Sequence, residues 1–115
     1  MIEVTLRDYL LDALKDIPVL FEKPKQVPEK YVIMRDIDAG IVNHISAVTI
    51  SFTVGAGSFY EAKVLSDQVK SVILNSITLP EVSSAKLGGE NGAAVPKETT
   101  YEYELIFNFF YFEEE

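Results

Sequence analysis

The feature that most restricts the fold is an aromatic strand pattern near the C-terminus, from about Thr99 to Phe112. Its residues alternate between two faces, as the side chains of a β-strand do. One face is apolar or aromatic throughout, whereas the other begins with Glu102 and Glu104 and ends apolar, at Phe110 and Phe112. A sheet covered by helices on one face should show a solvated second face, and the end of this strand departs from that rule.

Three further strands are predicted upstream. The clearest runs from Ser46 to Val54, where apolar residues alternate with small and polar ones. The segment from Tyr31 to Asp36 precedes it closely enough to pair with it antiparallel, and Asp38-Ala39-Gly40 has the composition of a turn. A short strand is expected from about Glu81 to Leu87. Residues 88–97 are rich in glycine and show no periodicity, so they predict a long mobile loop.

Two helices are predicted from apolar residues at three- and four-residue spacing. The first has its apolar face between Leu6 and Ile17, with Thr5 as a cap that has an acidic partner three positions later. Pro18 ends it, because proline disfavours a helical conformation at the preceding residue. The second begins at Ser58, again with a glutamate three positions later, and ends near Asn75.

The order helix, strand, strand, helix, strand, strand predicts an α+β fold. The simplest packing is a two-layer sandwich, with about four mainly antiparallel strands and both helices on one face. A chain of 115 residues is too short for two independent cores, so residues 1–115 are expected to form a single domain. The loop at 88–97 and the acidic end at 113–115 are expected to lie outside its regular elements.

Composition excludes several classes of function. Ten basic against eighteen acidic side chains give a net charge of −8, which would repel a phosphate backbone, so sequence-specific nucleic-acid binding is not expected. The absence of cysteine excludes disulfides and thiolate metal sites. No apolar run is long enough to span a membrane, and residues 1–17 are too charged for a signal peptide.

Two segments have residues of the kinds found in nucleotide-binding or catalytic sites, but neither has the full pattern that such a site requires. Gly55-Ala56-Gly57-Ser58 lies between a strand and a helix, but it lacks the third glycine of a dinucleotide site and the lysine of a P-loop. His44 is the only histidine, and Ser46 is the nearest hydroxyl. Residues two apart on a strand point the same way without contact, so no catalytic triad is predicted.

Paired carboxylates are the remaining candidates for chemistry. Asp36 and Asp38, with a single histidine nearby, are too few to indicate a metal site. Glu102 and Glu104 share a strand face, where a hydrolase could use them, but a solvated face explains them better. The residues therefore predict no catalytic site, no metal and no cofactor, and an enzyme is not expected.

The apolar outer end of the last strand needs a cover. Apolar residues on an uncovered sheet face promote aggregation, and the neighbouring glycine-rich loop has too few apolar groups to shield them. A partner subunit is the simplest cover. The alternative is that Phe110 and Phe112 fold back onto the first helix.

The order and spacing of these elements resemble a known family. An opening helix is followed by a proline-containing lead into a strand, Val27-Pro28-Glu29-Lys30-Tyr31-Val32-Ile33. An alternating strand with Ser51-Phe52-Thr53-Val54 then ends in a small-residue turn before a helix that contains Glu61-Ala62. A glycine-rich loop and a long aromatic strand finish the chain. In this pattern, over nearly its full length, the chain resembles the tail terminator (tail completion) family of long-tailed bacteriophages and prophages.

The resemblance implies a structural, non-enzymatic role in virion assembly. Members of the family form a ring, usually of six subunits, that caps the head-proximal end of the tail tube, stops its polymerisation and docks to the head. Implied partners are further copies of this chain, the tail tube protein and head–tail connector proteins, without a cofactor or a membrane. The implied location is the virion tail, assembled in the bacterial cytoplasm. DNA would pass through a lumen whose negative charge repels it.

The resemblance also implies where contacts with subunits or tube would form. In a closed ring, each subunit buries one patch against a different patch of its neighbour. The predicted loop would become ordered on assembly. The candidate interface residues are Ile106, Phe110, Phe112, Gly88, Gly89, Glu90, Asn91 and Gly92. A second interpretation is a head-closure or head-to-tail adaptor ring, which would bind the portal side instead.

Overall fold

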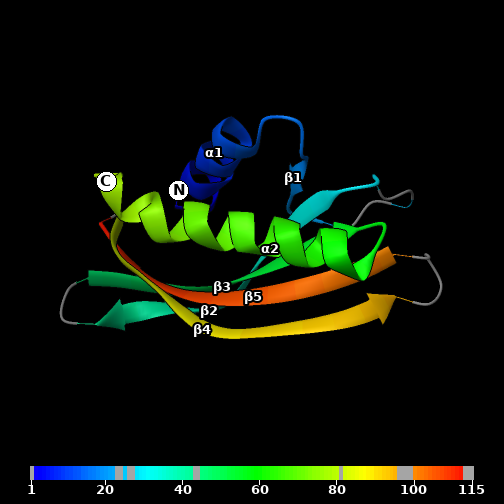
Figure 1. The fold of residues 1–115 in the computed structure, drawn as a ribbon. Coiled ribbons are helices and arrows are strands. Elements are labelled where there is room, and N and C mark those ends of the chain that lie inside the picture. Colours follow the sequence, from blue (N-terminus) through cyan, green and yellow to red (C-terminus); the bar gives the residue numbers. More distant parts are fainter. Residues whose placement is uncertain are drawn as a thin grey trace.

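Two helices pack on one face of a five-stranded sheet, in an α+β fold of two layers (Figure 1). The computed structural model describes residues 2–22, 25, 28–42, 45–80, 82–95 and 100–112. The helices are α1 (Ile2–Leu14) and α2 (Phe59–Leu74), and a 3₁₀ turn, η1 (Asn75–Thr78), follows α2. The predicted fold class, with both helices on one face, is confirmed.

The sheet has the strand order β1-β2-β3-β5-β4. Its strands are β1 (Val19–Leu20), β2 (Tyr31–Val42), β3 (Ile45–Ala56), β4 (Val82–Val95) and β5 (Thr100–Tyr111). The short β1 pairs in parallel with β2, and all other pairs are antiparallel. The prediction of about four strands was wrong, because two residues of β1 form a strand only through their pairing with β2 and carry no pattern of their own.

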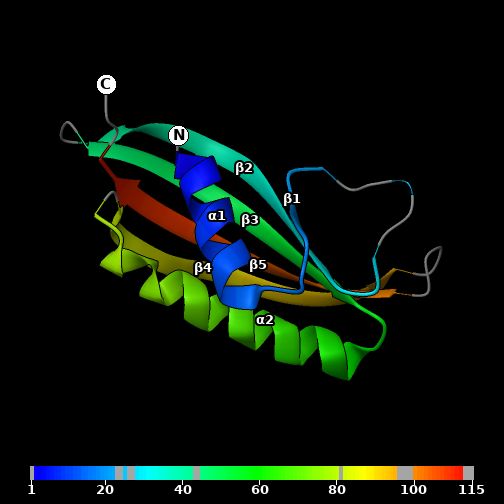
Figure 2. The same cartoon turned by 90° about the horizontal axis from the view of Figure 1, so that it is seen from above.

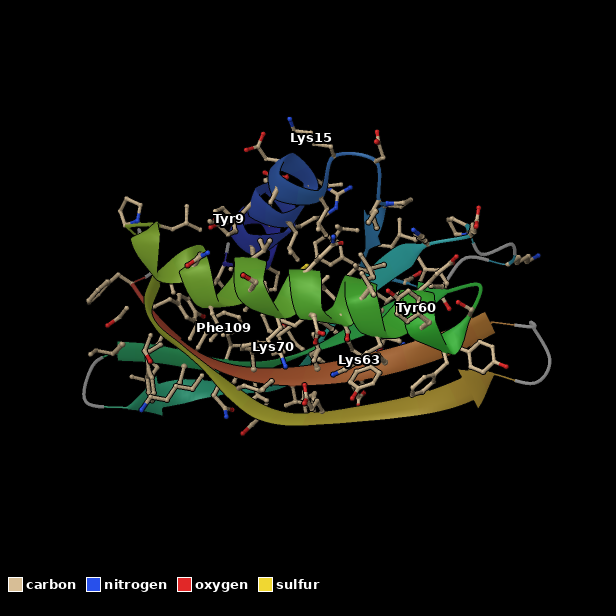
Figure 3. The ribbon with its side chains drawn as sticks, in the orientation of Figure 1. Tyr9, Lys15, Tyr60, Lys63, Lys70 and Phe109 are labelled. Carbon is tan, nitrogen blue, oxygen red and sulfur yellow. The ribbon has the colours of Figure 1, made fainter. Side chains whose placement is uncertain are left out.

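The core lies between the helices and the sheet. Phe52 of β3 meets Phe107 and Phe109 of β5 edge to face, with ring centroids 5.9 and 6.2 Å apart. Figure 3 shows Phe109 between α2 and the sheet, where it is almost fully buried. Seen from above, α2 runs along the β4 side, and α1 lies between α2 and β1 (Figure 2). The helices contribute Leu6, Leu10, Leu65, Val69 and Ile73 to this core.

The ends of the helices follow the predictions in part. The Ser58 hydroxyl accepts a hydrogen bond from the backbone N–H of Glu61 at 3.1 Å, so the predicted cap of α2 is confirmed. Thr5 is not a cap, because α1 already begins at Ile2. The helix also stops at Leu14 instead of Ile17. Lys15 ends it with a φ of 56°, and its N–H donates to the Leu11 carbonyl at 2.9 Å.

β2 and β3 are longer than predicted. β2 passes through Asp38-Ala39-Gly40, which was predicted as a turn, and reaches Val42. A register shift between Asp36 and Asp38 absorbs the extra residue Ile37 as a bulge. Pairing with β3 supplies hydrogen bonds along this stretch and outweighs the local turn preference.

The predicted mobile loop at 88–97 was wrong over residues 88–95, which form the second half of β4. β5 pairs with them from Gly89–Ile106 to Val95–Thr100, so the backbone hydrogen bonds of a neighbouring strand override the glycine content. Residues 96 and 97 lie outside the described part of the chain, as does the acidic end at 113–115. Neither described helix is long and apolar enough to cross a membrane.

Candidate functional site

The face of the sheet opposite the helices, called the outer face below, carries the candidate residues. Directly paired residues of antiparallel strands share a face, so the pairing register assigns them. Ile106 and Phe110 lie on this face, since they pair with Ser51 and Ala47 of β3 and alternate with the core residues of β5. Both are partly buried. Because Phe110 is on the opposite side of the sheet from α1, the alternative that it folds back onto the first helix is wrong.

The other candidates lie on or beyond the sheet edge. Phe112 follows the end of β5 with 56% of its surface exposed. Gly88 to Gly92 form the middle of β4, and Gly89 pairs directly with Ile106. The structure therefore places Gly89 beside Ile106 on neighbouring strands of the outer face.

Side-chain hydrogen bonds cross the outer face between strands. The Tyr31 hydroxyl donates to the Glu102 carboxylate at 2.7 Å, and the Ser51 hydroxyl donates to Glu104 at 2.9 Å. The Thr49 hydroxyl donates to the side-chain oxygen of Asn108 at 2.7 Å. Glu102 and Glu104, predicted as a solvated strand face, are thus partly buried acceptors that join β5 to β2 and to β3. Their geometry is that of a structural network.

At two glycines a side chain from a neighbouring strand comes close to the backbone. A Cβ atom on Gly55 would overlap the ring of Tyr31, which is fully buried. On Gly88, a Cβ would stand 2.9 Å from the side-chain nitrogen of Asn108. Gly55 belongs to the segment considered as a nucleotide loop, and its role is to let Tyr31 reach across β3.

A groove of about 450 Å³ lies on the outer face. Small residues such as Gly40, Ala47 and Thr49 line it together with Phe110 and Lys86. The groove spans β2, β3, β5 and β4, and its lining combines apolar surface with few charges. Such a surface is suited to burial against another protein and carries no converging catalytic groups.

The carboxylates of β2 separate across the bulge. Asp36 pairs with the core residue Ile50, whereas Asp38 pairs with Thr49 of the outer face, so the two point to opposite sides. Partial burial, the charge of Glu3 and a hydrogen bond with Glu3 raise the pKa of Asp36. Within the described ranges, no three His, Cys, Asp or Glu side chains could together hold a metal ion. His44 lies outside those ranges.

A polar link ties α2 to the β4 edge. Lys70 donates to the Glu90 carboxylate at 3.1 Å and stands 3.8 Å from Asp67, while Lys63 lies over the Tyr103 ring with its nitrogen 4.8 Å from the centroid. Both lysines reach from α2 toward the sheet (Figure 3). Glu90, a predicted interface residue, is therefore engaged within the chain on the helix side of β4.

Sequence reasoning missed the contact of Tyr31 with Glu102. The two residues are 71 positions apart, and the local pattern holds no signal that relates them. Gly55 gives no signal either, because the predicted strand ends at Val54 and Gly55 falls in the segment expected between strand and helix.

Comparison with known proteins identifies the fold. No family model matches the sequence, and no curated protein does either. Among solved structures, the chain is similar to one described as part of the "Virion of native gene transfer agent (GTA) particle", with a TM-score of 0.62 and 13% sequence identity. The match covers 89% of this chain and 83% of that chain. At this level of identity, the fold is what the two chains share.

Proposed function

We propose that this chain is a structural protein of a phage-like particle, a tail terminator that forms a ring on the head-proximal end of the tail tube. The observation that carries the proposal is the shared fold, which extends over 89% of the chain and belongs to a component of a gene transfer agent virion. The order of the sequence elements, which resembles the tail terminator family, is a second and separate argument for the proposal. In this role the ring ends tube polymerisation and offers the head a docking surface.

The outer face supports an assembly role. Ile106 and Phe110 are partly buried within one chain and lie beside a groove of about 450 Å³. Burial against a second protein would remove this apolar surface from water. The partners in this proposal are further copies of the chain, the tube protein and the head–tail connector, and no cofactor or catalytic step is involved.

The charge of the chain suits a ring through which DNA passes. A net charge of −8 per copy multiplies in a ring and repels phosphate groups, so a genome would move through without adhering. The proposal therefore places the protein in the virion, without sequence-specific contact with DNA.

The decisive experiment is to mix purified, labelled protein with tail tubes and, separately, with portal complexes. Electron microscopy should show label at one end of each tube, and tubes growing in its presence should stop elongating. Label on portal complexes alone would support the adaptor ring instead. Label on neither particle contradicts both roles.

A further inference from the structure

Both edges of the sheet have unpaired stretches. β4 pairs with β5 on one side only, and no described element runs along its other side (Figure 1). At the opposite edge, β1 covers only Val32 and Ile33 of β2 (Figure 2). Among the strands that the structure describes, the rest of β2 as far as Val42 pairs with β3 alone. Unpaired backbone N–H and C=O groups at such edges can accept a strand from another chain.

The direction of the strands determines how two copies could pair. β2, β3, β5 and β4 alternate in direction across the sheet. The β4 edge of one copy would therefore meet the β2 edge of a second copy in antiparallel orientation. This contact uses different patches on the two copies, so each copy keeps one free edge, and the contact repeats until a ring closes.

The pairing register places opposite charges at the two ends of one row. Asp38 pairs with Thr49, Thr49 with Asn108 and Asn108 with Lys86, all on the outer face. Inside the row, the Thr49 hydroxyl donates to Asn108 at 2.7 Å. The row thus begins with a carboxylate at the β2 edge and ends with an ammonium group at the β4 edge.

These two charges have no ionic partner within the described part of the chain. Lys86 and Asp38 are exposed, and the Asp38 carboxylate accepts a hydrogen bond from the adjacent Ala39 N–H, at 3.0 Å. In one copy they are separated by three strand spacings, about 14 Å, which is too far for an ion pair. A second copy set edge to edge in the same row would bring them together.

Around Asp38 and Lys86, both edge strands have segments that are free of register shifts. Register shifts in β4 fall between Val82 and Ser84 and between Leu87 and Gly89, so Ser84 to Leu87 is regular. In β2 the shift lies between Asp36 and Asp38, which leaves Asp38 to Val42 regular. Bulges disrupt the strand ladder locally, so these regular segments are where a second strand would pair in one defined register.

We propose that the β4 edge at Ser84 to Lys86 of one copy pairs antiparallel with the β2 edge of a second copy. Lys86 then lies opposite Asp38 of the partner subunit. The inference rests on the proposed function, since it supplies the contact that would build the ring. It assigns the strand pairing of the subunit interface to the edges, and Phe110, which pairs with Ser84, lies beside that contact on the outer face.

A disulfide trap tests this register directly. The neighbouring row runs from Gly40 through Ala47 and Phe110 to Ser84, so a Gly40→Cys, Ser84→Cys variant places one thiol at each edge. The chain has no native cysteine, and a Cβ on Gly40 meets nothing within 4 Å. Within one copy the two positions are about 14 Å apart, beyond the roughly 7 Å limit for bridged Cα atoms, so any disulfide joins two copies.

Oxidation of the double-cysteine variant should give a ladder of covalent multimers on a non-reducing gel. Either single-cysteine variant should give at most a dimer. The matched control pairs Gly40→Cys with Gln68→Cys, an exposed position on α2, and should give no ladder.

Charge exchange provides a second measurement. Lys86→Asp or Asp38→Lys alone places like charges opposite each other and should raise the concentration at half-assembly by about tenfold. The double variant Lys86→Asp, Asp38→Lys restores opposite charges and should return assembly toward the wild-type concentration. Circular dichroism of each variant confirms that the fold is retained.

Two results would overturn edge pairing. In the first, the wild-type protein assembles in light scattering, but the Gly40→Cys, Ser84→Cys variant forms no ladder and the charge variants assemble at the wild-type concentration. The second is a monomer at every concentration and no ladder. Neither result decides the proposed function, which labelling of tube ends tests separately.

Discussion

The Tyr31 hydroxyl of β2 reaches across β3 to the Glu102 carboxylate of β5, 2.7 Å away. Its ring lies over Gly55, the position of β3 directly between the two residues in the pairing register. Three strands are thereby joined by one fully buried side chain on the face away from the helices. The stability of the fold therefore depends on Gly55, because a side chain at this position would occupy the space of the Tyr31 ring.

Gly55→Ala should destabilise the fold. The added methyl group overlaps the Tyr31 ring, so the ring must move and its bond to Glu102 is disturbed. Overpacking of this kind costs about 1–3 kcal/mol of unfolding free energy, measurable by urea denaturation. The matched control is Gly40→Ala on β2, where the added Cβ meets nothing within 4 Å. Equal stability of the two variants would contradict the close packing of Tyr31 on Gly55.

Tyr31→Phe should cost less than Gly55→Ala, because it keeps the ring and removes only the hydroxyl. A hydrogen bond to a charged group contributes about 1.5–3 kcal/mol, so a loss near the lower end is expected. A double-mutant cycle with Glu102→Gln measures the coupling between the two side chains. Additive losses would mean that the bond across β3 contributes nothing to stability.

Lys15→Gly should stabilise the protein. Lys15 ends α1 with a φ of 56°, in the left-handed region where a side chain is unfavourable and glycine is not. The expected gain is about 0.5–1 kcal/mol by thermal or urea denaturation, after the greater freedom of glycine in the unfolded chain is subtracted. Ala13→Gly, inside the same helix, should instead lose about 1 kcal/mol. A loss at both positions would contradict the left-handed cap.

Asp36 should make stability fall as pH rises. Partial burial and Glu3 raise its pKa in the folded protein, so the folded state holds its proton to higher pH than the unfolded state does. The cost of ionising Asp36 is absent below its unfolded pKa and complete above its folded pKa. Asp36→Asn should therefore gain stability relative to wild type over that interval. Urea denaturation at a series of pH values measures the difference, and Glu3→Gln should reduce it.

Phe110→Glu should prevent assembly and leave the fold largely intact. Phe110 lies partly buried on the outer face, where a monomer can tolerate a carboxylate but an interface cannot bury one unpaired. Light scattering after size exclusion reports assembly, and circular dichroism reports folding. The neighbouring Phe109→Glu places a charge in the core, where Phe109 is 1% exposed, and should unfold the chain. If the Phe110→Glu protein assembles like wild type, the outer face around Phe110 is not part of the interface.

Local patterns in the sequence were sufficient to predict the helices and strands whose apolar residues recur with a regular period. The cap at Ser58, the alternation of β3 around Phe52 and the aromatic face of β5 were all readable, because helical and strand periods place apolar residues on one side. Helices on one face of an antiparallel sheet then follow from burying those sides together. The outer position of Phe110 follows from the same alternation.

Only the tertiary structure decided the features that depend on a partner strand. The sequence of β1 and of β4 from Gly88 onward has no strand pattern, and pairing with β2 and β5 supplies the hydrogen bonds that make them strands. The row that ends at Asp38 and Lys86 exists only after three strand pairs are in register. The sequence by itself therefore determined which faces are apolar, since that depends on nearest neighbours along the chain. The fold decided which distant residues meet, because strand register is set by contacts between segments far apart in the sequence.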